Sequence, residues 1–397
     1  MKDSSYTFQT RLLHNDHKFD KQTGAVSVPI QQASTFHQVD FDQPGKYDYS
    51  RSGNPTREAL EATIATLENG VRGFAFASGM AAISTSFMLL SQSDHVLISE
   101  DVYGGTYRMI HDVLGRFGIE HTFVDMTDLE KVATAIQANT KLIYIETPSN
   151  PLLKITDIQA VVKLAKANDC LTFVDNTFMT PALQRPLDFG ADIVLHSATK
   201  FIAGHSDVVA GLAVVKDEQL GEKLAFLQNS FGSILSAHDS WLVLRGLKTL
   251  HCRLEQSSRS AFRIAHVLTK QSLVEEVYYP GFSFHPGNST HLYQAAGPGA
   301  VLSFRLPDEH AVRLFTKYIQ IPVYAVSLGA VESILSYPAR MSHASMPPEE
   351  RRKRGITDGL LRLSVGLENA DDLLEDFKKA FAKISQQYTL SSEGIQL

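Results

Sequence analysis

The organisation of this chain is clearest in residues 171–200, which read LTFVDNTFMTPALQRPLDFGADIVLHSATK. Two short apolar runs in this stretch, 171–174 and 192–195, predict β-strands. Each run is followed by polar side chains, Asp175 after the first and Lys200 shortly after the second. In an open parallel sheet, ligands bind beyond the carboxyl ends of the strands, so these residues are candidates for chemistry.

Similar apolar runs alternate with amphipathic stretches on both sides of this segment, which indicates βαβ units and a mostly parallel sheet. The other predicted strands are residues 73–77, 95–99, 121–124, 141–146 and 211–215. The helices predicted between strands are residues 80–90, 106–117, 129–138 and 158–168. Residues 61–247 are therefore expected to form a doubly wound α/β domain on a seven-stranded sheet.

The two ends of the chain differ from this region. Residues 1–60 are rich in Gln, Asp, His, Gly and Pro with little apolar periodicity, which predicts an extended arm. A smaller α/β domain is expected over residues 248–397. It begins within a long helix predicted for 246–269. Its predicted elements are strands 301–306, 323–326 and 361–365, a helix from Glu309 and a helix at 371–384.

Composition excludes several classes of protein. The 397 residues include 37 Lys plus Arg and 43 Asp plus Glu, a net charge of −6, and 44% are hydrophobic. This balance fits a globular protein and gives no basic footprint for nucleic acid or an anionic membrane. The two cysteines, Cys170 and Cys252, lie far apart without CxxC spacing, so neither a disulfide framework nor a structural zinc site is indicated. With no signal-peptide pattern and no long apolar span, a cytoplasmic location is expected.

Five strand ends carry candidate ligand-binding residues. Ser78-Gly79 precedes a helix, where backbone amides could bind phosphate, although a serine N-cap is the commoner role. Tyr103 before two glycines could stack on a flat heteroaromatic ring or simply pack in the turn. Asn150 lies between two prolines; it could bind a ligand, but an asparagine in this setting is also typical of a turn. Asp175 could pair with a protonated ring nitrogen or cap the following segment, and Lys200 could be an ordinary surface charge.

Taken together, these groups describe one ligand. A phosphate cradle, a stacking tyrosine, an acid and a lysine are what pyridoxal phosphate requires, because the lysine forms a Schiff base and the acid pairs with the pyridinium nitrogen. A nucleotide site is not supported, since neither GxGxxG nor GxxxxGK[ST] occurs.

A family resemblance supports this interpretation. The chain resembles the pyridoxal-phosphate enzymes of Cys/Met metabolism from about residue 7 to residue 384. This family includes cystathionine β- and γ-lyases, cystathionine γ-synthase, methionine γ-lyase and O-acetylhomoserine sulfhydrylase. The matching blocks are Tyr49-Ser50-Arg51 with Asn54-Pro55-Thr56, Ser78-Gly79-Met80, Tyr103-Gly104-Gly105-Thr106, Glu146-Thr147-Pro148-Ser149-Asn150-Pro151, Asp175-Asn176-Thr177-Phe178, Ser197-Ala198-Thr199-Lys200 with Gly204-His205-Ser206-Asp207, and Arg362-Leu363-Ser364-Val365-Gly366. The resemblance implies the fold-type I transferase fold of these enzymes.

The resemblance also implies roles at the cofactor. Lys200 would carry the Schiff base and move protons, Asp175 would keep the pyridine nitrogen protonated, and Tyr103 would stack on the ring. Whether Tyr103 or Lys200 accepts the proton of the incoming substrate amine stays open. The implied phosphate ligands are the amides of Gly79 and Met80, the hydroxyls of Ser197 and Thr199, and Tyr49 and Arg51 from a neighbouring subunit.

At the substrate, Arg362 would bind the α-carboxylate with help from Ser327, and Asn150 would contact the 3′-oxygen side of the cofactor. The resemblance implies a homotetramer built from two dimers. It gives His196, His205 and Asp207 a structural role around the lysine loop, so no metal site is expected.

Two positions bear on the reaction. Val326 stands where γ-synthases and γ-lyases of the family carry a glutamate before Ser-Leu-Gly, and Gly105 stands where methionine γ-lyases carry a cysteine. The remaining pattern, in 24–30, 34–38 and 325–338, is most similar to bacterial cystathionine β-lyases. This implies cleavage of L-cystathionine to homocysteine, pyruvate and ammonia in methionine biosynthesis. A γ-lyase, a γ-synthase or sulfhydrylase, a transaminase, and a catalytically silent cofactor-binding regulatory module are the alternatives.

Overall fold

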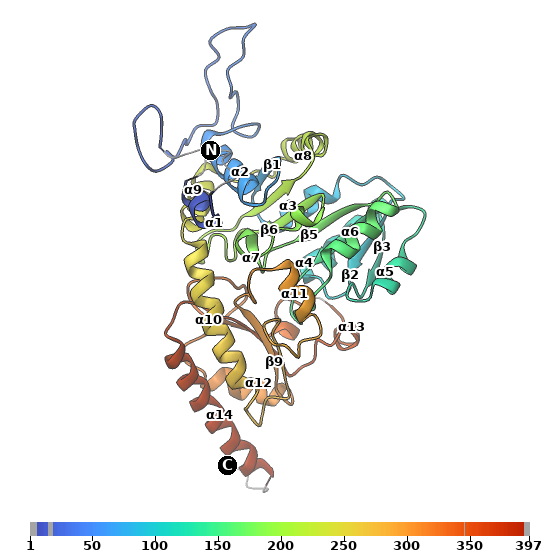
Figure 1. Cartoon of the computed structure of the whole chain (residues 1–397), viewed down its shortest axis with the longest axis vertical. Helices are drawn as coiled ribbons and strands as arrows, with labels where there is room; N and C mark the ends of the chain where they lie inside the picture. Colours follow the sequence, from blue (N-terminus) through green and yellow to red (C-terminus); the bar gives the residue numbers. More distant parts are fainter. Residues whose placement is uncertain (1–5, 15–18, 345, 393–397) are drawn as a thin grey trace.

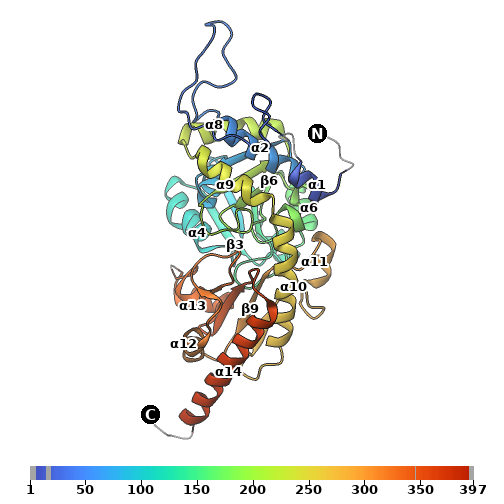
Figure 2. The same ribbon diagram turned by 90° about the vertical axis from the view of Figure 1, so that its left-hand side faces the viewer.

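The structure, a computed structural model, describes residues 6–14, 19–344 and 346–392 (Figure 1). Two β-sheets lie one above the other along the long axis of the molecule, and the long helix α10 (Leu250–Leu268) runs down one side of the lower sheet (Figures 1 and 2). Within the described residues, no helix is both long and apolar enough to cross a membrane.

The larger sheet has seven strands in the order β1-β7-β6-β5-β4-β2-β3. All neighbouring strands are parallel except where β7 pairs with β1 and β6. The expected mostly parallel seven-stranded α/β sheet is therefore confirmed, with small shifts at the strand ends. The strands are β1 Arg72–Phe76, β2 His95–Ser99, β3 Glu120–Val124, β4 Thr140–Glu146, β5 Leu171–Asp175, β6 Ile193–Ser197 and β7 Gly211–Val215.

Side chains alternate between the two faces of this sheet, as the period of two in a strand requires. Ile143 and Ile145 pack in the core beneath α2, α5 and α6, whereas Leu142 and Tyr144 pack in the core beneath α3 and α8. The helices around the sheet are α2 Pro55–Leu67, α3 Gly79–Phe87, α4 Gly104–Arg108, α5 Leu129–Ala135, α6 Ile158–Ala167, α7 Thr180–Leu183, α8 Glu218–Phe231 and α9 Ala237–Leu247, with a 3₁₀ turn at Pro186–Phe189.

Two helix predictions were wrong in detail. The helix expected over 106–117 divides into α4, a π turn (Met109–Val113) and a 3₁₀ turn (Leu114–Phe117). The single helix expected over 246–269 is instead the end of α9 followed by α10. A Cβ at Gly246 would lie 2.2 Å from the Ala203 carbonyl oxygen, so this glycine packs against the loop after Lys200. Arg253 donates to the Gly246 oxygen at 2.9 Å, and the same oxygen also accepts from the Thr249 amide at 3.2 Å.

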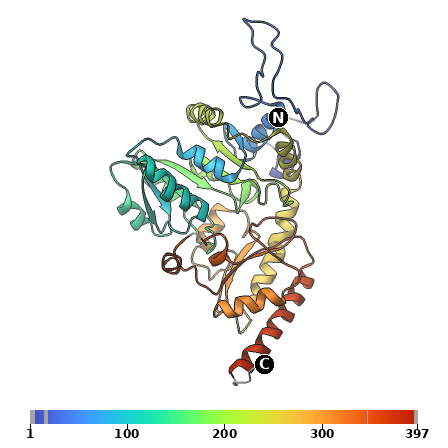
Figure 3. The same ribbon diagram turned by 180° about the vertical axis from the view of Figure 1, so that it is seen from behind.

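The N-terminal region contains more helix than expected. Helix α1 (Phe8–Leu13) and the first turn of α2 lie within the range predicted as an arm. Asn54 caps α2 by accepting from the Thr56 and Arg57 amides, and Pro55 occupies the first helical position. Between the two helices, the described residues project from the body as extended loops (Figures 1 and 3).

The smaller sheet has the order β10-β11-β12-β9-β8, and helices α10, α12 and α14 share its core. Aromatic packing dominates there: the rings of Phe315 and Phe377 lie 5.5 Å apart. The predicted smaller α/β alternation is present, although β8 and β11 were not predicted and the strand expected at 323–326 is shorter. The elements are β8 Glu276–Tyr278, α11 Asn288–Gln294, β9 Val301–Arg305, α12 Glu309–Tyr318, β10 Val323–Tyr324, β11 Ile334–Ser336, a 3₁₀ turn Pro338–Arg340, α13 Pro348–Lys353, β12 Leu360–Ser364 and α14 Ala370–Ser392.

Candidate active site

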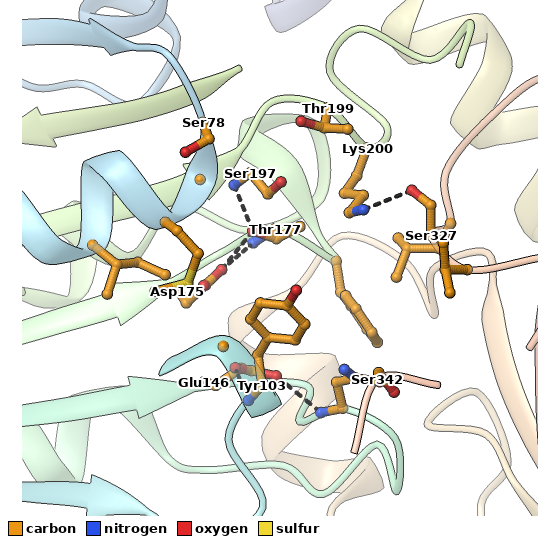
Figure 4. A pocket seen from close by; sticks show the side chains of 18 of the residues that line it. Ser78, Tyr103, Glu146, Asp175, Thr177, Ser197, Thr199, Lys200, Ser327 and Ser342 are labelled. Carbon is orange, nitrogen blue, oxygen red and sulfur yellow. Dashed lines mark hydrogen bonds between the residues drawn. The ribbon is translucent and has the colours of Figure 1, made fainter. Parts of the chain in front are cut away.

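A cavity of about 690 Å³ lies at the carboxyl ends of the parallel strands, where loops of the smaller sheet approach the larger one (Figure 4). This is the expected ligand position in an open α/β sheet. All predicted site residues except Tyr49 and Arg51 line it. The predicted residues that line the cavity are Gly79, Met80, Tyr103, Asn150, Asp175, Ser197, Thr199, Lys200, Val326, Ser327 and Arg362.

Lys200 follows β6 and projects into this cavity. Its Nζ donates a hydrogen bond of 2.6 Å to the Ser327 hydroxyl (Figure 4). Burial, together with the nearby charge of Arg362, lowers the pKa of Lys200 to about 8. At pH 7 about a tenth of this amine is therefore unprotonated, far more than of an ordinary lysine, and the unprotonated form is the one that a nucleophile or base requires.

Asp175 ends β5 and is buried at the floor of the cavity. Its carboxylate accepts from the Thr177 amide at 3.0 Å, the Thr177 hydroxyl at 2.5 Å and the Tyr144 hydroxyl at 3.2 Å. Burial raises the pKa of Asp175, whereas the Thr177 and Tyr144 bonds and the charge of His196 oppose that rise. A fixed, desolvated carboxylate of this kind can pair with a protonated heterocycle.

An anion site begins at the N-terminus of α3. Ser78 caps this helix by accepting from the Ala81 amide, which leaves the first-turn amides of Gly79 and Met80 at the cavity. A Cβ at Gly79 would lie 2.8 Å from the Ser197 Cβ, so only glycine lets the helix begin this close to Ser197. The Thr199 hydroxyl bonds to the Ala210 amide at 3.0 Å.

Arg362 lies on β12 and is 3% exposed. Its Nη1 donates to Asn150 Oδ1 at 2.7 Å, and its Nη2 donates to the Ser327 carbonyl oxygen at 2.7 Å. Burial lowers the pKa of Arg362 to about 10, so the group remains cationic at neutral pH. Its Nε has no hydrogen-bond partner within the described residues. A buried guanidinium held by neutral acceptors in this way retains the capacity to bind a carboxylate.

Gly105 lies close to the Tyr103 ring, with little free space around it. The Tyr103 ring lines the cavity and is 40% exposed. A Cβ at Gly105 would lie 2.5 Å from Tyr103 Cε1 and 2.8 Å from Met80 Sδ. Glycine at this position therefore leaves room for the ring.

Tyr49 and Arg51 lie outside this cavity. The Tyr49 side chain is 47% exposed, and Arg51 Nε donates to Asn229 Oδ1 at 3.2 Å. The Arg51 guanidinium lies 5.4 Å from the centre of the Tyr49 ring. Their expected role in a neighbouring subunit remains a prediction.

Two of the three residues expected to have a structural role around the lysine loop, His196 and His205, have hydrogen-bond partners. His196 is fully buried, and its Nε2 lies 2.7 Å from Glu68 Oε1. His205 Nδ1 bonds to the Ala203 carbonyl oxygen at 2.7 Å. No group of three His, Cys, Asp or Glu that could hold a metal occurs in the part of the chain that the structure describes.

Sequence reasoning missed several lining residues. Glu146, Thr177, Arg108 and Ser342 also face the cavity. Glu146 and Thr177 could have been found, because each belongs to a quoted strand-end block. Ser342 offered no such signal, since only folding brings its loop to the strand ends.

Comparison with known proteins identifies the family. The model of the family "Cys/Met metabolism PLP-dependent enzyme" matches residues 9–382. The chain belongs to this family. A cystathionine β-lyase (MetC) of Bacillus subtilis is 66% identical over 97% of this chain and 99% of its own length. A cystathionine γ-lyase of the same organism is 53% identical over 95% of this chain and 99% of its own length.

A solved structure of a related enzyme has the same fold as this chain. A crystal structure of cystathionine γ-lyase from Lactobacillus plantarum, complexed with L-serine, has a TM-score of 0.93 and 50% identity, covering 96% of this chain and all of that one. The chain is thus a PLP-dependent enzyme of Cys/Met metabolism with the fold-type I architecture.

The residues of the cavity fit pyridoxal phosphate. The first-turn amides at Gly79, where a Cβ would fill the space, suit a phosphate. The buried carboxylate of Asp175 suits the ring nitrogen. Lys200 offers an amine of lowered pKa. Arg362, with its unpartnered Nε, remains for an amino-acid carboxylate.

Proposed function

We propose that this chain is a cystathionine β-lyase, which cleaves L-cystathionine to homocysteine, pyruvate and ammonia in methionine biosynthesis. The choice of reaction rests on Val326, an apolar residue at the position where γ-type members of the family carry a glutamate. It lines the cavity next to Ser327 with 65% of its surface exposed, so an apolar side chain stands at the mouth of the site. The β-lyase that is 66% identical supports the same choice.

The cofactor would be held along the strand ends. The Gly79 and Met80 amides, with the Ser197 and Thr199 hydroxyls, would bind its phosphate, and Asp175 would bind its ring nitrogen. Tyr103 would stack on the ring, and Asn150 would approach its 3′-oxygen side. When bound, the cofactor supplies an electron sink that stabilises negative charge at the substrate Cα.

The protein groups then orient the substrate and move protons. Arg362 binds the α-carboxylate, which places the Cα–H bond near Lys200. Lys200 Nζ removes the proton from Cα and delivers a proton to the leaving sulfur at Cβ. Ser327 keeps Nζ within the cavity through its hydroxyl, which accepts from Nζ at 2.6 Å.

A shared site between subunits is part of this proposal. Tyr49 and Arg51 lie on an arm whose apolar residues Val39 and Phe41 are 88% and 99% exposed. Such exposure is typical of a segment that packs on another chain. We infer that the arm reaches a second copy, where Tyr49 and Arg51 complete the phosphate site, in a homotetramer of two dimers. A cytoplasmic location also belongs to the proposal, supported by the two free cysteines.

Product analysis tests the reaction. The purified enzyme is incubated with L-cystathionine, and the keto acid and the thiol are identified by mass spectrometry. Pyruvate with homocysteine is expected. The outcome 2-oxobutyrate with cysteine would replace the proposal with γ-elimination, and absence of any product would favour a silent cofactor-binding module.

Cystathionine γ-lyase is the second candidate, because two relatives of that name share about half of their residues with this chain. The two reactions differ in one step: loss of a Cγ substituent needs a further deprotonation at Cβ. A Val326→Glu variant discriminates further, since a gain of γ-cleavage would assign this position to the choice of reaction.

A further inference from the structure

Glu146 is a buried carboxyl group in the cavity that the proposed reaction leaves without a role. It ends β4 and is 6% exposed. Glu146 and Asp175 are register partners on β4 and β5, so two carboxyl groups lie side by side. Burial and the neighbouring Asp175 raise the pKa of Glu146 well above its usual value. Burying such a group is costly, so its contacts need an explanation.

The two oxygens of Glu146 bind two different loops. Oε2 accepts from the Tyr103 amide at 2.9 Å, and Oε1 accepts from the Asn150 amide at 3.1 Å. Tyr103 follows β2 and Asn150 follows β4, so a single carboxyl group joins two strand ends. In Figure 4, Glu146 lies directly beneath the Tyr103 ring.

Each of the two loops has a separate task at the site. Tyr103 presents its ring to the cavity but has no side-chain hydrogen bond within the described structure, so its backbone bond to Glu146 is a main anchor. The side chain of Asn150 accepts from Arg362 Nη1 at 2.7 Å. Movement of the Asn150 backbone would therefore shift the guanidinium.

We propose that Glu146 is a positioning residue that couples the aromatic face for the cofactor to the guanidinium for the substrate carboxylate, by holding the Tyr103 and Asn150 amides with one carboxyl group. The inference rests on the proposed function, because it takes Tyr103 and Arg362 as the groups that bind cofactor and substrate. It predicts that one side chain controls two affinities through the backbone of two loops.

The test uses Glu146→Gln, which keeps the shape of the side chain and one acceptor oxygen but replaces the other oxygen with an NH₂ that cannot accept. Two quantities are measured: the Kd of the apoenzyme for pyridoxal phosphate, by absorbance titration, and the Kd of the holoenzyme for propionate, by its perturbation of the cofactor spectrum. Both Kd values are expected to rise, each by about tenfold, because at least one of the two amide bonds is lost. Glu130→Gln, an exposed change in the first turn of α5, is the control and should leave both constants unchanged.

A double variant distinguishes positioning from general support of the fold. In a Tyr103→Ala background, Glu146→Gln should alter cofactor affinity less than in the wild type, because only the Asn150 route remains, but should still weaken propionate binding. Glu146→Asp, which is too short to reach both amides, serves as the second variant if the glutamine variant does not fold. A lowered Tm with both affinities unchanged would overturn the proposal, as would a cofactor effect that persists undiminished without the Tyr103 ring. Failure of the wild-type enzyme to form pyruvate would refute the reaction alone, since neither affinity measurement depends on it.

Discussion

The Lys200 Nζ lies 2.6 Å from the Ser327 hydroxyl, although the two residues lie in loops that follow strands of different sheets. Ser327 adopts a φ of +86°, a left-handed backbone conformation that is costly for a residue other than glycine. Its carbonyl oxygen accepts from Arg362 Nη2 at 2.7 Å. The strained residue therefore joins the proposed base to the proposed carboxylate ligand.

Two substitutions of Ser327 should separate its hydroxyl from its backbone. Ser327→Ala and Ser327→Gly both remove the bond to Lys200, so both should lower kcat. Ser327→Gly should be more stable than Ser327→Ala by about 1 kcal/mol, because glycine adopts positive φ readily. Urea unfolding of the two variants measures this difference, and equal stability would show that the backbone at this position is not strained.

Lys200→Ala should abolish the visible absorbance of the cofactor joined to the lysine and lower kcat by about 100- to 10,000-fold. The reason is that the variant lacks both the amine that binds the cofactor and the group that moves the proton. Lys216→Ala, at the end of β7, is the matched control and should keep colour and activity. Retention of that same absorbance band in the Lys200→Ala protein would contradict the assignment.

Cofactor capture should depend on pH with a midpoint of about 8, the pKa to which burial and Arg362 lower Lys200. Only the neutral amine attacks the aldehyde, so the rate of reconstitution of the apoenzyme should rise as pH increases through 8 and level off above it. Arg362→Gln removes a positive charge, which should raise the Lys200 pKa and move the midpoint to higher pH. Stopped-flow absorbance measures the rate. The exposed Arg313→Gln should leave the midpoint in place, and the assignment of the midpoint fails if both variants behave alike.

Gly105→Ala should lower kcat/KM roughly 10- to 100-fold, because its Cβ would lie 2.5 Å from the Tyr103 ring and displace it. Gly115→Ala is a useful comparison, since the nearest atom to its Cβ would be 3.8 Å away. Steady-state kinetics of both variants test the prediction. An active Gly105→Ala enzyme with unchanged KM would show that the Tyr103 ring can move without cost.

Complementation tests the shared site. Arg51→Ala subunits and Lys200→Ala subunits should each be weakly active, yet a mixed oligomer should contain some sites with both residues intact. Random reassociation at equal amounts should restore about a quarter of the wild-type activity. Each variant refolded alone is the control. If mixing restores nothing, Arg51 does not act in a neighbouring site.

Much of the site could be predicted because parallel strands bring their carboxyl ends to one edge of a sheet. Asp175 and Lys200 could be selected as candidates in this way, from apolar runs and the polar residues after them. Arg362 and Ser327 could not, since they lie on a strand and in a loop of the smaller sheet's region, and only a family resemblance pointed to them. The break between α9 and α10 was missed because it depends on contacts of Gly246 and Arg253 with distant backbone.

The amino-acid sequence is sufficient for the α/β fold class, the order of strands and helices along the chain, and the residue types at the strand ends, because these depend on local periodicity and on short blocks. It does not specify that Glu146 lies beside Asp175, that Glu146 binds the amides of both Tyr103 and Asn150, or that Lys200 meets Ser327. Those contacts arise from strand register and from the packing of the two sheets, which depend on interactions between residues far apart in the chain. Burial at this junction also sets the charge of the site, lowering the Lys200 pKa to about 8.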